Sequence, residues 1–213
     1  MYEKYGKRLL DILFSLILLP LVLLVILLFG VLIKLEDRGP IFYCSERLGK
    51  HGKVFKMYKL RTMKVNAPDL RNPDGSTYNS DNDPRLTKIG RFLRITSLDE
   101  LPQLFNVIKG DMSLIGPRPD LPEHMRYYEG AEIRKLEVLP GITGYNQAYY
   151  RNAAKWKDRL KNDLYYVDNI SFYLDCKIFF KTIERIILMK GIYANPKSKK
   201  VEGEDDNELL TKT

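Results

Sequence analysis

The sequence is poor in the residues that stabilise small secreted domains or bind zinc. Among its 213 residues there are two cysteines, Cys44 and Cys176, and two histidines, His51 and His124. Two cysteines without paired spacing cannot form a disulfide framework, and they are typical of a protein that faces the reducing cytosol. Two isolated histidines do not make a histidine-rich zinc site. Any metal ion should therefore be a hard cation held by carboxylates and phosphate oxygens.

The sequence also lacks the common glycine-rich nucleotide-binding motifs. It contains no G-x-G-x-x-G and no Walker A sequence, so dinucleotide-binding and P-loop folds are not expected. A D-x-D triplet, Asp81 to Asp83, lies in a polar loop between Pro68 and Pro84. It matches the metal motif of nucleotide-sugar glycosyltransferases. Because three letters in a loop are weak support, we keep this function only as an alternative.

Only one long hydrophobic run is present. Ile12 to Ile33 gives 22 consecutive residues without a charge, almost all aliphatic or phenylalanine. This run excludes an ordinary soluble domain, and the lack of a second one excludes a polytopic channel or transporter. It is too long for the apolar region of a signal peptide, and no small-residue cleavage site follows Ile33. The segment is expected to remain as a membrane anchor.

The topology of this segment has two interpretations. A helix of 22 residues is roughly 33 Å long, enough to cross a bilayer once. However, Pro20 interrupts the run and leaves two halves that are each too short to span. Basic residues flank both ends, as expected if both ends lie on the cytoplasmic side. These flanking residues are Lys4, Lys7, Arg8, Lys34, Arg38, Arg47 and Lys50. A simple span and a re-entrant helix-break-helix hairpin therefore both remain open from the residues alone.

Positive charge is concentrated next to the apolar run. The whole chain has a net charge of +8, and residues 34–61 hold eight basic and three acidic side chains, a local excess of five. Such a patch attracts anionic lipid headgroups or a phosphorylated substrate. Alternating residues from Val54 predict a short strand, and residues 170–187 predict an amphipathic helix that either packs on the core or lies in the headgroup region. The tail from residue 196 to 213 is predicted to be disordered.

An acidic pair, Asp99 and Glu100, precedes a segment with helical apolar spacing that ends at Gly110. A capping box between Ser97 and Glu100 would explain the pair without any catalytic role. Pro102 argues against that box, because it would then fall inside the helix, whereas a cap at Asp99 places it in the first turn. At the helix mouth, an ionised Asp99 could attack phosphorus while its neighbour holds Mg²⁺ or moves a proton.

A second motif follows directly. In the sequence GPRP, two prolines restrict the backbone on both sides of Arg118, so a stiff loop should present the guanidinium. The forked guanidinium suits a diphosphate better than a flexible lysine does. An incidental arginine in a surface turn is the alternative explanation.

Together these motifs resemble the bacterial sugar transferase family, the monotopic polyprenyl-phosphate phosphoglycosyl transferases. The matching segments are YKLRTM (58–63), SLDELPQLFNV (97–107), KGDMSLIGPRP (109–119), PGITG (140–144), the apolar segment with its proline, and Tyr165 to Asn169. The chain is similar in size to minimal members such as the phospho-diacetylbacillosamine transferase. The resemblance implies a mainly helical α+β fold. A re-entrant hairpin (1–36) and amphipathic interfacial helices would surround a small cytosolic catalytic core (37–195).

The resemblance also implies a mechanism. Asp99 would attack the β-phosphate of a UDP-sugar, release UMP and pass the phosphosugar to undecaprenyl phosphate, with Glu100 and Mg²⁺ assisting. This reaction would take place on the cytoplasmic face of the bacterial inner membrane, and a homodimer is compatible with the family. The phosphate-binding candidates implied by the resemblance are Arg118, Arg94, Arg47, Lys59 and Arg151.

The chain departs from the family pattern after the PGITG motif. Many members read GWAQVNGRN there, whereas this chain has Tyr145, Asn146, Tyr149 and Tyr150 at four of the changed positions. The sugar preference of a relative therefore cannot be transferred to it. The remaining rival is a non-enzymatic scaffold that uses its basic face on lipid or nucleic acid. Nucleic acid is disfavoured because the basic residues flank a membrane segment.

Overall fold

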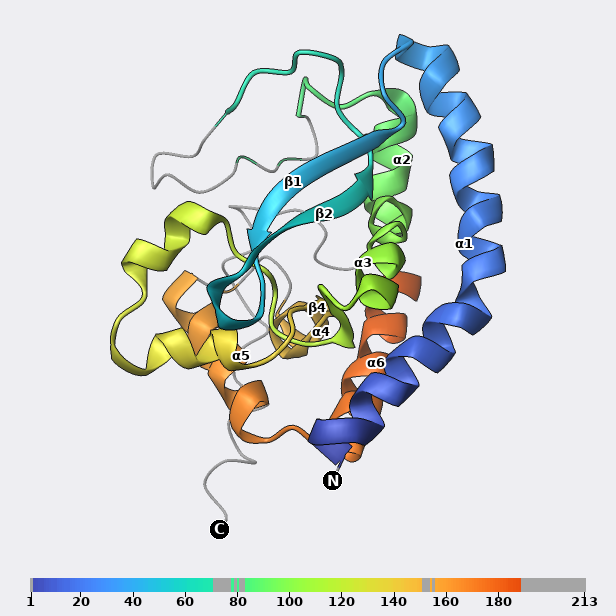
Figure 1. The fold of residues 1–213 in the computed structure, drawn as a ribbon. Helices are drawn as coiled ribbons and strands as arrows, with labels where there is room; N and C mark the ends of the chain where they lie inside the picture. Colours follow the sequence, from blue (N-terminus) through green and yellow to red (C-terminus); the bar gives the residue numbers. More distant parts are fainter. Residues whose placement is uncertain are drawn as a thin grey trace.

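The computed structural model describes residues 2–70, 78, 80, 83–150, 154 and 156–188. Arg151, Asp81 and the predicted disordered tail lie outside these residues. The chain forms the mainly helical α+β fold that the sequence predicts (Figure 1). Its α-helices are α1 (Lys7–Asp37), α2 (Lys88–Thr96), α3 (Gln103–Lys109), α4 (Tyr145–Tyr149), α5 (Trp156–Asp168) and α6 (Phe172–Ile187). Its strands are β1 (Phe42–Leu48), β2 (Val54–Leu60), β3 (Ser113–Ile115) and β4 (Gly141–Thr143). Single-turn and 3₁₀ segments lie at Tyr2–Gly6, Lys50–Gly52, Leu98–Glu100, Pro122–Tyr127 and Gly130–Glu137.

Helix α1 contains the apolar run. Among the described residues it is the one helix long and apolar enough to cross a membrane. Only 17% of its most apolar 18-residue stretch is buried. Pro20 lies inside the helix, which continues through it without a gap. Figure 1 shows that α1 changes direction about midway along its length. The helix is therefore bent, and a proline inside a helix is a common cause of such a bend. Whether the bent helix re-enters one leaflet remains a prediction.

Strands β1 and β2 form an antiparallel hairpin, which confirms the strand predicted from Val54. Its register pairs Leu48 with Val54 beside the turn and Tyr43 with Lys59 near the open end. Phe55 and Met57 are buried with Val107 of α3 and with Met112, which follows α3. Because side chains alternate across a strand, Lys59 extends from the same face of β2 as Phe55 and Met57. The hairpin thus carries Lys59 toward the α3 side of the molecule.

Strands β3 and β4 are parallel and bring the GPRP and PGITG motifs together. The N–H of Gly116 donates to Thr143 O at 2.9 Å, and the N–H of Gly141 donates to Pro117 O at 2.9 Å. A Cβ atom at Gly116, Gly141 or Gly144 would collide with the facing backbone. Glycine is needed at these positions because the two loops approach so closely.

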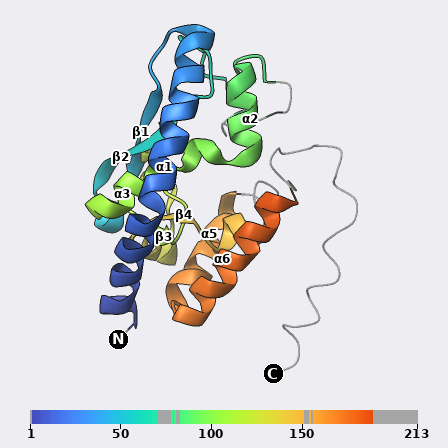
Figure 2. The ribbon, with the colours of Figure 1, turned by 90° about the vertical axis from the view of Figure 1, so that its right-hand side faces the viewer.

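Helix α6 confirms the amphipathic helix predicted over residues 170–187, with Ser171 as its N-cap. Leu174 and Ile178 pack with Tyr166 of α5 in a core cluster, and Figure 2 shows α6 beside α5. Ile183 and Ile187, in the last turns of α6, are exposed. Phe172, Tyr173, Phe179 and Phe180 are exposed as well, so α6 presents apolar and aromatic side chains to its surroundings along its length. This surface fits the headgroup interpretation of the helix.

Candidate active site

The acidic pair lies in a short turn between two helices. Helix α2 ends at Thr96, Ser97 adopts a left-handed conformation (φ 59°), and Leu98–Glu100 form a single 3₁₀ turn before α3. The predicted helix start at Asp99 is wrong, because α3 begins at Gln103 with Pro102 as its N-cap. Proline lacks an N–H and its ring clashes with a preceding helical turn, so the helix forms only after it. Ser97 makes no capping hydrogen bond, so the capping box that would have explained the pair is absent.

Asp99 and Glu100 have different surroundings within this turn. Asp99 is buried, with 8% of its surface exposed, whereas Glu100 is half-buried. Lys59 Nζ donates to Glu100 Oε1 at 2.6 Å, and both side chains of this ion pair are partly shielded from solvent. The site therefore combines one desolvated carboxylate with a neighbouring carboxylate that has a cationic partner.

Burial raises the pKa of Asp99 to about 6, and the negative charge of Glu100 adds to the rise. The positive charges of Lys59 and Arg94 act in the opposite direction and lower this pKa. The sequence suggested that a helix N-terminus would favour the anion, but α3 begins only at Gln103, and the burial of Asp99 raises its pKa instead. At pH 7 Asp99 is still mainly ionised, and a poorly solvated carboxylate is the more reactive form for attack.

Arg94 and Lys59 reach the acidic turn from two different elements. Arg94 lies in the last turn of α2, and its Nε donates to Thr62 Oγ1 at 3.2 Å. Lys59 comes from β2, two residues before Arg61. Among the phosphate-binding candidates within the described residues, Lys59 and Arg94 exert the largest effects on Asp99. They supply positive charge where a phosphate would meet the carboxylate.

Arg118 is exposed between a buried Pro117 and a half-buried Pro119, as a guanidinium presented by a stiff loop should be. It lines a small cavity with Leu48, Gly49 and Lys135. Leu48, which lines this cavity with Arg118, pairs with Val54 of β2. Val54 lies five residues before Lys59, which corresponds to about 16 Å along the strand. The backbone of Arg118 therefore lies near the turn of the hairpin, whereas Lys59 lies near its open end.

Arg47 lies between these two positions on the hairpin. It pairs with Phe55 in the register, and strand alternation places it on the same face as Phe55 and Lys59. Arg151, the fifth candidate, lies outside the described residues. The structure therefore positions four of the five predicted cations relative to the dyad, and their binding roles remain predictions.

The donor set at the turn fits Mg²⁺. No group of three or more His, Cys, Asp or Glu side chains that could hold a metal ion occurs within the described ranges. Mg²⁺ is commonly bound by one or two carboxylates together with waters and substrate phosphates, rather than by a cage made only of protein ligands. The desolvated carboxylate of Asp99 and the adjacent Glu100 match that requirement.

Two further residues change the sequence-based interpretation. Asn106 of α3 is fully buried; it accepts from Tyr58 N at 3.0 Å and donates to Lys56 O at 2.8 Å. This amide fastens the helix after the dyad to the edge of β2, a role that no spacing in the sequence signals.

Asp83, from the D-x-D triplet, is buried and forms an ion pair with Arg85 at 2.7 Å. The Asp83 carboxylate is therefore engaged in a structural ion pair with Arg85.

Comparison with known proteins extends over nearly the whole chain. Residues 2–189 match the bacterial sugar transferase family. An uncharacterised sugar transferase, EpsL, of Bacillus subtilis is 42% identical over 186 residues, which cover 87% of this chain and 89% of the relative.

Two longer relatives carry names that state an activity. The undecaprenyl-phosphate galactose phosphotransferase of Salmonella typhimurium is 38% identical over 90% of this chain and 42% of the relative. The UDP-N-acetylgalactosamine-undecaprenyl-phosphate N-acetylgalactosaminephosphotransferase of Aeromonas hydrophila is 40% identical over 86% of this chain and 44% of the relative. The chain thus spans less than half the length of these two enzymes, but most of EpsL. It belongs to the bacterial sugar transferase family.

Proposed function

We propose that the protein transfers a sugar-1-phosphate from a UDP-sugar to undecaprenyl phosphate through a covalent intermediate on Asp99. The observation that carries this proposal is the buried Asp99 carboxylate, next to Glu100 and within the field of Lys59 and Arg94. The names of the Salmonella and Aeromonas relatives support the polyprenyl acceptor and a hexose-type sugar. The product would be a polyprenyl diphosphate sugar, the first membrane-bound species of a bacterial glycan pathway.

The reaction proceeds in two displacements at one phosphorus atom. A carboxylate oxygen of Asp99 attacks the β-phosphorus, and the bond from this phosphorus to the oxygen that bridges to the α-phosphate breaks, so that UMP leaves. A phosphate oxygen of undecaprenyl phosphate then attacks the same phosphorus. The bond to Asp99 breaks, which restores the carboxylate and joins the phosphosugar to the lipid phosphate.

The chain's own residues contribute charge and orientation to both steps. Lys59 and Arg94 neutralise the phosphate oxygens next to Asp99, while Arg47 and Arg118 extend positive charge toward the turn of the hairpin. These cations provide positive charge for the diphosphate of a nucleotide sugar. Glu100 and Asp99 would hold Mg²⁺, which supplies neutralisation of negative charge on the diphosphate.

The membrane arrangement follows from α1. Its exposed apolar surface, its bend and the proline inside it support a re-entrant helix that enters and leaves on the cytoplasmic face of the bacterial inner membrane. This topology keeps the dyad in the cytosol, where the soluble nucleotide sugar meets the lipid phosphate. Assembly into a homodimer is a further prediction, which mass measurement in lipid nanodiscs tests.

The function is tested by product analysis. Wild-type protein is incubated with undecaprenyl phosphate and one donor at a time from a panel of UDP-N-acetylhexosamines, UDP-hexoses and UDP-diaminosugars. It should release UMP with one member of the panel. Asp99→Asn should yield none. Release of UDP instead of UMP would indicate glycosyl transfer, and full activity of Asp99→Asn would exclude the proposed nucleophile.

A further inference from the structure

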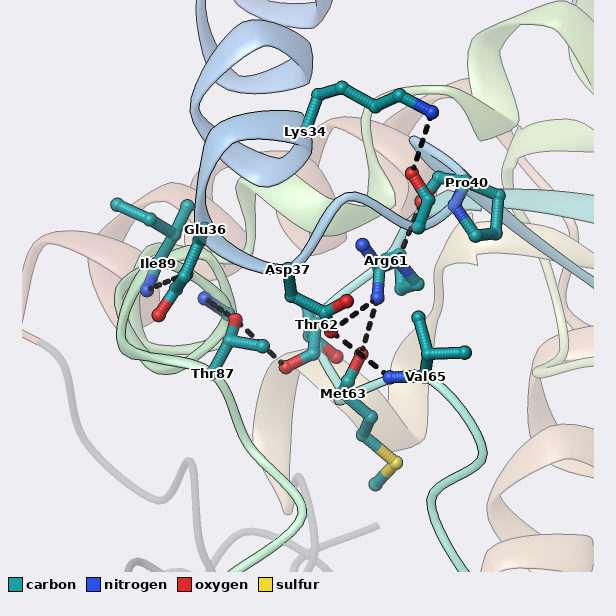
Figure 3. Close-up of polar contacts among 12 residues, drawn as sticks. Lys34, Glu36, Asp37, Pro40, Arg61, Thr62, Met63, Val65, Thr87 and Ile89 are labelled. Atoms are coloured by element: carbon teal, nitrogen blue, oxygen red, sulfur yellow. Dashed lines mark hydrogen bonds and ion pairs between the residues drawn. The ribbon is translucent and has the colours of Figure 1, made fainter.

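The two ends of α1 cap the two helices that flank the acidic turn. At the C-terminal end, Glu36 accepts hydrogen bonds from the backbone N–H groups of Lys88 (2.7 Å) and Ile89 (3.1 Å), the first two residues of α2. Figure 3 shows Glu36 reaching the start of α2 beside Thr87. Thr87 Oγ1 accepts from the next N–H, that of Gly90, at 2.9 Å. Glu36 thus binds amide groups that a helix start otherwise leaves unpaired, and its charge suits the helix dipole there.

The N-terminal end of α1 makes the complementary contact with α3. Arg8 Nη1 donates to Val107 O at 2.7 Å, and Arg8 Nη2 donates to Ile108 O at 3.1 Å. These carbonyls belong to the last turn of α3, where a helix has unpaired acceptors and a partial negative charge. A guanidinium satisfies both carbonyls at once because its N–H groups are fixed in one plane.

The segment held at its two ends is the one that carries Asp99 and Glu100. The chain runs from α2 through Ser97 and the acidic turn into α3, so Glu36 and Arg8 hold the outer ends of a helix–turn–helix. Ser97 has a positive φ, a conformation that residues with a Cβ rarely adopt and that surrounding structure must enforce. Two anchors on one long helix provide such enforcement. In Figures 1 and 2, α1 runs alongside α2 and α3.

We infer that Glu36 and Arg8 are positioning residues, and that α1 acts as a clamp that sets the orientation of the Asp99–Glu100 turn. The inference rests on the proposed function, in which Asp99 attacks phosphorus. Pro20 lies between the two anchors, so the bend of α1 determines how its two ends are presented to α2 and α3. The helix that meets the lipid is therefore mechanically connected to the reacting carboxylate.

Neighbouring contacts strengthen the C-terminal anchor. Arg61 Nη1 donates to Asp37 Oδ2 at 2.6 Å, and the same carboxylate oxygen accepts from Val65 N at 3.0 Å (Figure 3). These bonds fix the last residue of α1 to the end of β2. Because Asp37 is adjacent to Glu36, they restrict the position from which Glu36 reaches α2.

The test uses the first turnover in the absence of lipid acceptor, where each active molecule releases one UMP. The rate constant of that burst reports how well Asp99 is oriented, whereas its amplitude reports the fraction of folded protein. Glu36→Gln and Arg8→Gln should each lower the rate constant about 10- to 100-fold, the effect expected when a reacting group is slightly misplaced. The KM for the UDP-sugar should stay within about threefold, because neither residue belongs to the phosphate-binding group.

Matched controls remove exposed ion pairs by the same substitutions. Glu184→Gln breaks a pair with Lys181, and Arg134→Gln breaks a pair with Asp168; both should keep the wild-type rate constant. Arg8→Lys retains the charge but not the forked guanidinium, and it should give an intermediate rate constant. This variant tests the role of Arg8 if Arg8→Gln does not fold. Wild-type rate constants in Glu36→Gln and Arg8→Gln, or a loss of amplitude alone, would overturn the clamp. A wild-type protein without any burst would instead count against the proposed function.

Discussion

Lys59 Nζ lies 2.6 Å from Glu100 Oε1, so a strand residue and a turn residue 41 positions apart form an ion pair at the base of the acidic turn. The pair places a positive charge beside Asp99, where it lowers the pKa of that buried carboxyl. It also connects the hairpin to the segment that carries the dyad. Lys59 is therefore the residue through which β2 controls the charge state of Asp99.

Replacing this lysine should shift the pH dependence of the reaction. In Lys59→Gln the pKa of Asp99 rises above its wild-type value of about 6, because the lowering charge is lost while burial remains. The acidic limb of the pH profile for the first-turnover rate constant should move to higher pH, and activity at pH 6.5 should fall about tenfold. Lys109→Gln is the control, since Lys109 is exposed near Tyr58 and Asp111. An unshifted acidic limb in Lys59→Gln would contradict this assignment.

The raised pKa of Asp99 predicts a stability cost at neutral pH. Between pH 3.8 and about 6 the folded state retains a proton that the unfolded chain has released, so stability falls as pH rises through this window. Above it the penalty is complete, and two pKa units correspond to about 3 kcal/mol at most. Asp99→Asn, which cannot ionise, should therefore unfold at a higher temperature than wild type at pH 7.5.

The check is thermal unfolding of both proteins in EDTA, which prevents a bound cation from stabilising the ionised carboxylate. The difference in midpoint should disappear near pH 4, where the wild-type carboxyl is protonated in the folded state. A variant that is less stable than wild type at pH 7.5 would show that burial of Asp99 carries no penalty.

The elements that the sequence predicted are those whose cause is local. Alternation from Val54 predicted β2, and the end of α3 at Gly110 follows from its left-handed conformation (φ 92°). The start of α3 was misplaced because Pro102 moved it beyond the dyad. The raised pKa of Asp99 was not foreseen for a different reason: its desolvation depends on packing by distant segments, which no local pattern encodes. The contacts of Glu36, Arg8 and Asn106 are likewise long-range and left no signal in the sequence.

Asn106 should be a strong determinant of stability. Asn106 is fully buried, and its two hydrogen bonds to β2 are partly buried; Asn106→Ala leaves the N–H of Tyr58 and the C=O of Lys56 without their side-chain partner, which should cost about 2–4 kcal/mol. Asn169→Ala removes an exposed bond to Tyr165 O and should cost less than about 0.5 kcal/mol. Denaturant unfolding of the two variants compares them directly. Equal stability of the two would mean that Asn106 does not fasten α3 to β2.

The topology of α1 can be measured by cysteine labelling after the native thiols, exposed Cys44 and half-buried Cys176, have been replaced. Single cysteines at Lys4 and Lys34 should react with a membrane-impermeant maleimide from the same side in oriented vesicles. Labelling from opposite sides would establish a simple span. Pro20→Leu should straighten the helix and shift labelling toward opposite sides, and an unchanged pattern would assign the bend to packing instead of to the proline.

A covalent intermediate on Asp99 would be detected directly by mass measurement of the intact protein. Wild-type protein incubated with Mg²⁺ and its UDP-sugar, without lipid acceptor, should gain the mass of one phosphosugar and release one equivalent of UMP. Peptide mapping should place the added mass on Asp99, undecaprenyl phosphate should remove it, and Asp99→Asn should not acquire it. An enzyme that produces the lipid-linked sugar at full rate with no added mass at any time, or with the mass on another residue, would contradict the account.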